Sequence, residues 1–160
     1  MKKISLLLIA CIAIILPSCG DMDDCSVNTD IDTQVIVVKS GFLSISSSKL
    51  TENTYPIYVY KAGYNGETVT VNLSVNETIL SDYNSEHATS YVTLPTSYYT
   101  VGNGVALTSK HYSDFIPVTF NTSAIEQDYS GNEYVLPLVI SGVPEEKTNE
   151  NNYILILLEK

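Results

Sequence analysis

The sequence predicts an all-β protein, an antiparallel β-sandwich of seven to nine strands with one short helical turn. Short runs of β-branched and aromatic residues recur from Val35 to the end of the chain, and turn-forming residues separate them. About 142 of the 160 residues remain once an N-terminal signal is set aside, which is the size of one domain. No internal repeat interrupts this pattern, so we expect one sandwich domain over residues 34–160.

The first predicted strands lie in the N-terminal half of this domain. Residues 35–38 form a short β-branched run, and residues 55–60 form a second, with Pro56 near its start, as an edge strand tolerates. After the turn signal at residues 63–66, residues 69–75 alternate strictly between apolar and polar. The apolar face of this strand consists of Val69, Val71, Leu73 and Val75. The alternation predicts a half-buried strand.

Residues 77–87 break the β pattern. Ile79 and Tyr83 are four residues apart, which is the spacing of one helix face. Either Ser74 or Asn76 can cap a helix here, because both side chains accept hydrogen bonds from free backbone N–H groups. The segment therefore predicts one or two helical turns.

The β pattern returns after residue 90 and continues to the C-terminus. The predicted strands are residues 91–95, 98–101, 105–107, 115–120, 134–141 and 152–159. Gly102-Asn103-Gly104 supplies a tight turn between two of them. Residues 153–158 are apolar on both sides, as in a strand at the centre of a sheet. A short helix at the chain end is the alternative.

The N-terminus has the layout of a secretory signal. A positive start is followed by the uncharged apolar run of residues 4–16, which is too short to cross about 30 Å of hydrocarbon. The run ends in Leu16-Pro17-Ser18-Cys19, and a cysteine at the cleavage point resembles the bacterial lipobox. This resemblance implies that residues 1–18 are a signal peptide and that Cys19 is lipidated. An ordinary secretory signal with a chance cysteine is the alternative.

Residues 19–33 contain few apolar positions and predict a flexible acidic leader. Asp21, Asp23 and Asp24 follow the lipid cysteine directly, and such a run resembles the export signal of Bacteroidetes surface lipoproteins. The alternative is a solvated leader that is acidic by composition alone. We expect a lipid anchor in the outer membrane, with the domain facing the cell exterior.

Charge and cysteine content narrow the function class. The formal net charge is −10, it falls to −12 when Lys2 and Lys3 leave with the signal, and arginine is absent. Nucleic-acid binding needs clustered positive charge, so we expect no nucleic-acid partner. Cys25 is the one cysteine left after processing and lipidation, which excludes a disulfide within the mature chain.

Catalytic and metal-binding signals are absent from the sequence. The two histidines, His87 and His111, have no metal-ligand spacing. No nucleophile, zinc-protease or phosphate-loop motif occurs. We therefore expect no enzyme activity, no cofactor and no metal site.

The order of features resembles one domain-of-unknown-function family. A Ser81-Asp82-Tyr83-Asn84 segment follows the alternating strand, Leu94-Pro95 and Tyr98-Tyr99 come next, and Tyr134-Val135-Leu136-Pro137-Leu138 leads to the final apolar strand. The family forms the N-terminal immunoglobulin-like module of Bacteroidetes surface lipoproteins of the glycan-utilisation type. The resemblance covers residues 35–158. It implies an accessory module that contacts polysaccharide or another surface lipoprotein.

Family members often carry a glycan-binding or glycoside-hydrolase module after this domain. The sequence here stops at Lys160, so we expect a non-catalytic role. The alternative, from another functional class, is a structural or adhesive protein whose sandwich is a spacer or assembly unit. Exposed coplanar aromatic rings in a groove would favour glycan binding, whereas a flat apolar patch or an open sheet edge would favour the structural role.

Twelve tyrosines are the one compositional excess. Tyrosine rings are rigid and amphipathic and can stack on sugars, although strand propensity also explains their number. The tyrosines beside turns or next to another tyrosine are the candidate ligand-binding residues, and they are Tyr64, Tyr98, Tyr99 and Tyr112.

The lipobox predicts that Cys19→Ala leaves an unprocessed or released protein, because the thiol is the attachment point for the lipid. The measurement is intact-mass analysis of the wild-type and variant proteins from the membrane fraction. A wild-type mature chain without added acyl mass would contradict the anchor.

Overall fold

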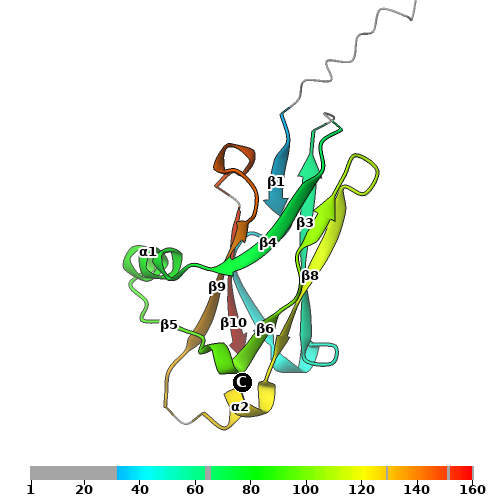
Figure 1. Ribbon diagram of the computed structural model, residues 1–160. Helices are drawn as coiled ribbons and strands as arrows, with labels where there is room; N and C mark the ends of the chain where they lie inside the picture. Colours follow the sequence, from blue (N-terminus) through cyan, green and yellow to red (C-terminus); the bar gives the residue numbers. More distant parts are fainter. Residues whose placement is uncertain (1–31, 64–65, 129, 151, 160) are drawn as a thin grey trace, which may run out of the picture.

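The computed structural model describes residues 32–159 except for residues 64–65, 129 and 151. Within these residues, ten strands form two facing sheets, and two short helices lie outside them (Figure 1). The predicted all-β sandwich is confirmed. One strand more than predicted is present, because residues 41–46 form a strand although their glycine and serines gave little β signal.

The first sheet has four strands and is antiparallel throughout. Its order is β1 (Gln34–Val37), β3 (Thr54–Ala62), β8 (Ser113–Phe120) and β6 (Tyr99–Val101). Pro56 was predicted to mark an edge strand, but β3 lies inside the sheet. The proline is tolerated because β1 pairs only with residues 59–62, and because Pro56 lies opposite Pro117, where neither residue has an N–H to offer.

The second sheet has six strands. Its order is β2 (Gly41–Ser46), β10 (Tyr153–Glu159), β9 (Tyr134–Ser141), β4 (Val69–Val75) and β7 (Val105–Leu107), and β5 (Val92–Thr93) also pairs with β9. Two pairs, β2 with β10 and β5 with β9, are parallel, so the sandwich is not purely antiparallel. The first of these arises because the chain leaves β1 in one sheet and enters β2 in the other near Gly41, whose φ of +88° suits glycine.

Helix α1 (Glu77–His87) covers the outer face of the second sheet. Its eleven residues make about three turns, which is longer than predicted. Asn76 is the cap, and its side-chain oxygen accepts the N–H of Thr78 at 3.0 Å. The helix is stable at this length because Leu80 packs on Val135 and Leu155 of the sheet. A second helix, α2 (Thr122–Glu126), is capped in the same way by Asn121.

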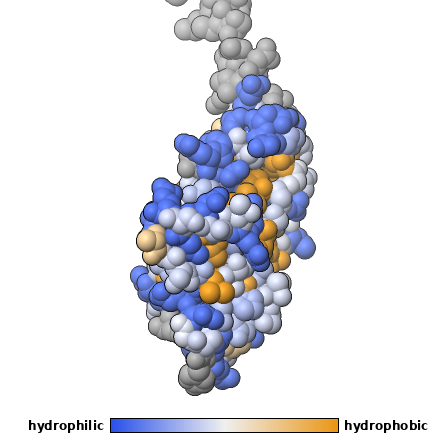
Figure 2. All heavy atoms as spheres, turned by 90° about the vertical axis from the view of Figure 1, so that its left-hand side faces the viewer, coloured by the Kyte–Doolittle hydropathy of each residue, from blue (hydrophilic) through white to orange (hydrophobic). Residues whose placement is uncertain are grey.

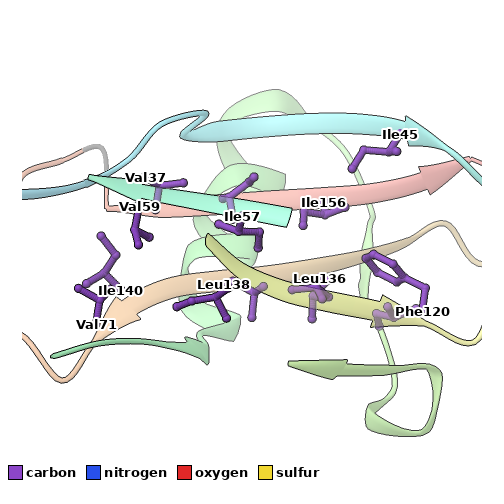
Figure 3. Close-up of a cluster of buried hydrophobic side chains, with 14 of the residues drawn as sticks. Val37, Ile45, Ile57, Val59, Val71, Phe120, Leu136, Leu138, Ile140 and Ile156 are labelled. Atoms are coloured by element: carbon purple, nitrogen blue, oxygen red, sulfur yellow. The ribbon is translucent and has the colours of Figure 1, made fainter. Parts of the chain in front are cut away.

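The main core lies between the two sheets (Figure 3). Its central side chains come from strands of both sheets and include Val37, Ile45, Ile57, Val59, Val71, Phe120, Leu136, Leu138, Ile140 and Ile156. Strand β10 is buried on both faces, since Ile154 and Ile156 point into this core and Leu155 packs under α1. The prediction that the last strand is central in its sheet is confirmed by its place between β2 and β9.

The alternating strand β4 follows its prediction in its first half. Val69 and Val71 are buried, but Leu73 is half-buried and Val75 is exposed. The two halves of β4 have different partners, since residues 69–71 pair with β7 and residues 72–75 pair with β9 just before α1 begins.

Lys61 is the exception to an apolar core. It follows Val59 on the inward face of β3, and only 2% of it is exposed. Its side-chain nitrogen, Nζ, has no hydrogen-bond partner among the described residues. Such a group lowers the stability of the fold, because burial removes its water without replacing it.

We expect Val71→Asp to destabilise the domain by on the order of several kcal/mol, because it buries a charge that has no partner. Thr70→Asp is the matched control, since Thr70 is exposed on the opposite face of the same strand. Thermal unfolding followed by circular dichroism measures both. Equal losses of Tm in the two variants would show that the face assignment is wrong.

Candidate functional site

The outer face of the four-stranded sheet carries exposed aromatic rings. Strand alternation turns Ile57 and Val59 into the core and Tyr58 and Tyr60 outward. Four rings are exposed there by 37–53%: Tyr58, Tyr60, Tyr112 and Phe115. We call these four residues the aromatic face. No described helix covers them, in contrast to the outer face of the other sheet, which α1 covers.

The four rings form two contacting pairs. Tyr58 lies opposite Phe115 in the β3–β8 register, with ring centroids 5.7 Å apart and planes tilted by 54°. Tyr60 meets Tyr112 edge to face, with centroids 5.5 Å apart and planes at 75°. The backbone N–H of Lys61 donates to the carbonyl of Tyr112 at 2.7 Å, which holds this residue beside the end of β3. The rings are therefore ordered and exposed, but they are not coplanar and lie on a sheet face.

The aromatic face is poor in charge, although the chain has a net charge of −10. The four strands of this sheet contain one acid, Asp114, and one base, the buried Lys61. Asp114 pairs with His111 at 2.9 Å, and this hydrogen bond, with one from the backbone N–H of Phe115, lowers the pKa of the Asp114 carboxyl. This sheet face is uncovered, aromatic and nearly uncharged. Such a face is typical of a binding surface rather than of a surface that contacts only water.

A second aromatic cluster has a structural role. Phe42 of β2 stacks on Tyr83 of α1 with centroids 5.0 Å apart, and Tyr83 stacks on His87 at 4.1 Å. Phe42 and Tyr83 are half-buried between the helix and the sheet, with Tyr91 beside them. These rings therefore pack α1 against the outer face of the second sheet. From the α1 side, hydrophilic residues predominate on the surface and hydrophobic residues show as a narrow band (Figure 2).

The structure separates the predicted ligand-binding tyrosines. Tyr112 belongs to the aromatic face, whereas Tyr98 and Tyr99 are half-buried against the core. Tyr64 lies outside the described residues, as do the predicted lipidation site Cys19 and the predicted export residues. The export residues are Asp21, Asp23 and Asp24.

Tyr58, Tyr60 and Phe115 were not among the predicted ligand-binding residues. Alternation could have found them, because Tyr58 and Tyr60 alternate with Ile57 and Val59, and Phe115 precedes the buried Ile116. Among the described residues, no group of three or more His, Cys, Asp or Glu side chains could hold a metal ion. No helix in the described part of the chain has the length and apolarity to cross a membrane.

A polar network ties the end of the sandwich together. The Tyr98 hydroxyl donates to Asp128 Oδ2 at 3.1 Å, and the Ser130 N–H donates to Asp128 Oδ1 at 2.8 Å. The hydrogen bonds from Ser130, with others from Tyr134 and Tyr98, lower the pKa of Asp128 to about 2. The hydrogen bond between the Tyr98 hydroxyl and Asp128 also raises the pKa of Tyr98. This network joins Asp128 and Ser130 to Tyr98 and to Tyr134 at the start of β9.

The comparisons with known proteins agree with this architecture. A family model described as an N-terminal domain matches residues 26–147, which is most of the chain. The chain belongs to this family of N-terminal domains. The resemblance inferred from the order of its strands and motifs is therefore confirmed. Among curated proteins, none matches the chain.

Several solved structures of similar fold are proteins of Bacteroides. A candidate carbohydrate-binding protein of Bacteroides ovatus aligns over 79% of this chain and 37% of its own length, with 21% identity and a TM-score of 0.65. A two-domain protein of unknown function from Bacteroides fragilis aligns over 86% of this chain and 49% of its own, with 15% identity and a TM-score of 0.59.

A third structure is EndoBT-3987 of Bacteroides thetaiotaomicron with a Man5GlcNAc product. It aligns over 74% of this chain and 28% of its own length, with 17% identity and a TM-score of 0.52. At these identities the likeness shows the fold. In all three comparisons the chain spans less than half the length of the other protein.

The lowered pKa of Asp128 predicts a loss of stability in acid. Its folded-state pKa of about 2 lies below the ordinary value of 3.8, so its contribution is present above about pH 4 and is lost as the pH falls toward 2. We expect Asp128→Asn to lose stability at pH 7 and to show a smaller decline between pH 4 and pH 2. Tyr98→Phe should show a smaller version of both changes, because it removes one of the hydrogen bonds to Asp128. Parallel stability curves for wild type and Asp128→Asn, from urea unfolding across this pH range, would refute the role.

Proposed function

We propose that this domain is a non-catalytic accessory module of a surface glycan-utilisation system and that it binds glycan through the aromatic face. The observation that carries the proposal is the grouping of four exposed rings on an uncovered, charge-poor sheet in an acidic protein. The Bacteroides neighbours support it, since one is a candidate carbohydrate-binding protein and another was solved with a glycan product.

Binding would be weak and shared among the rings. A stacked ring contributes on the order of 1 kcal/mol, so four rings contribute about 4 kcal/mol, which corresponds to a Kd near 1 mM. Tyrosine suits this role because the ring stacks on the apolar side of a sugar while the hydroxyl stays in water. Three of the four rings are tyrosines.

The tilt between the rings favours one form of the ligand. Planes inclined by 54° and 75° cannot all lie flat on the surface of a polysaccharide crystal. They can contact successive faces of a single chain in solution. The ligand class is therefore a soluble glycan chain.

We expect Tyr112→Ala and Tyr58→Ala each to weaken glycan binding several-fold with little change in Tm, because both rings are about half exposed. Val92→Ala is the control, an exposed apolar residue outside the aromatic face. The measurement is a titration of the full chain in phospholipid nanodiscs with soluble polysaccharides, beside pull-down on insoluble ones. No detectable binding of any soluble chain at millimolar concentration would refute the proposal.

We further propose that the protein is lipid-anchored through Cys19 in the outer membrane and faces the cell exterior. The lipobox and the acidic run of Asp21, Asp23 and Asp24 support this location. Replacing the three aspartates with alanine should retain the protein on the periplasmic side. Protease shaving of intact cells measures display, and equal removal of variant and wild type would count against the export signal.

A structural role, as a spacer or adhesive unit, is the second candidate function. It is favoured by exposed rings that are not coplanar and lie on a sheet face rather than in a groove, and by the course of the chain. Strand β1 begins at one end of the sandwich, and β10 finishes at the opposite end (Figure 1). A module entered and left at opposite ends adds its full length to a chain of domains. Absence of glycan binding by the wild-type chain in the titration above would favour this role.

A further inference from the structure

A pocket of about 380 Å³ opens at the end of the sandwich where β10 finishes. Its floor is apolar and includes Leu94, Ile125 and Leu158, which are buried members of the main core. Its volume lies in the range of small-molecule sites. It shares no residue with the aromatic face, so an inference from it goes beyond glycan binding there.

The pocket has a wall held in place by hydrogen bonds. Tyr134 lines it, and the Tyr134 hydroxyl lies 3.2 Å from Ser130 Oγ and accepts from Asn132 Nδ2 at 3.3 Å. The Tyr134 ring meets the Tyr98 ring edge to face, with centroids 6.0 Å apart. Tyr98 in turn donates to Asp128, so the tyrosine wall is fixed from two sides. A preformed wall lowers the entropy lost on binding.

The rim of the pocket is negatively charged. Glu133 and Glu159 both line it, and Ser44 Oγ donates to Glu159 Oε1 at 2.5 Å, which orients that carboxylate. The described lining residues include no lysine, arginine or histidine. An anion would be repelled here, whereas a cation would meet two carboxylates beside the aromatic ring of Tyr134.

We propose that this end pocket binds an organic ammonium group carried on an apolar body. The apolar part occupies the floor of Leu94, Ile125 and Leu158, and the positive nitrogen lies at the rim near Glu133 and Glu159. Such a group can belong to a free amine or to a lysine side chain of a partner protein, and the chemistry that recognises it is the same.

The test uses the full chain in phospholipid nanodiscs and ligand-observed NMR, with empty nanodiscs as the blank. The first arm compares benzyltrimethylammonium, benzyl alcohol and benzoate, which share an aromatic body and differ in charge. The second arm compares a short peptide holding lysine beside leucine with the same peptide acetylated on the lysine nitrogen. The variant Glu133→Gln/Glu159→Gln keeps the shape of the rim and removes its charge, and its thermal unfolding is checked against the wild type.

We expect the cation to bind more tightly than benzyl alcohol and benzoate not to bind. The double variant should weaken binding of the cation by about threefold or more and leave benzyl alcohol unaffected. Binding in the first arm supports a free amine as the ligand, and binding in the second arm alone supports a lysine of a partner protein. Absence of binding in both arms up to about 10 mM, equal binding of benzoate, or unchanged affinity in the double variant would overturn the proposal.

Discussion

The burial of β10 on both faces is the constraint on which the rest of the fold depends. Its parallel pairing with β2 begins with Ile154 opposite Gly41, so the last strand holds β2 in the second sheet. Ile154 and Ile156 fill the core on one face, and Leu155 supports α1 on the other. A fully buried aliphatic side chain contributes about 1.5–3 kcal/mol, so these few residues stabilise both sheets and the helix together.

The same constraint makes the two outer faces of the sandwich different. The second sheet presents Val135 and Leu155 outward, and this apolar surface must be covered, which α1 does with Leu80 and the rings around Tyr83. The first sheet presents Tyr58, Tyr60 and Phe115 outward, and no helix of residues 32–159, as far as they are described, covers it. Tyrosine hydroxyls can stay in water, so this face remains soluble while it offers ring surface to a ligand.

Two separate surfaces therefore carry the proposed chemistry. The aromatic face depends on strand alternation in β3 and β8, and its rings touch each other on a nearly uncharged sheet. The end pocket depends on the Tyr98–Asp128–Tyr134 network, which holds an acidic rim over apolar core residues. The first suits sugar rings, and the second suits a cation on an apolar group.

Sequence patterns found the strands whose signal is local. Residues 69–75, 105–107 and 134–141 were predicted with the bounds that the structure shows, because alternation and β-branched runs define them. Residues 41–46 were missed, since their glycine and serines carry little propensity and they become a strand only by pairing with β10. The helix was placed correctly but made too short, because its length depends on packing against Val135 and Leu155.

By itself, the sequence determined the all-β class and the central position of the last strand, because these follow from composition and local periodicity. The resemblance to an N-terminal-domain family rested instead on the order of the motifs along the chain. Only the tertiary structure decided which tyrosines are exposed. Tyr98 and Tyr99 pack against the core, while Tyr58, Tyr60 and Tyr112 gather with Phe115 on one face. The physical reason is that exposure depends on what covers each face of a sheet, and strand order sets that cover.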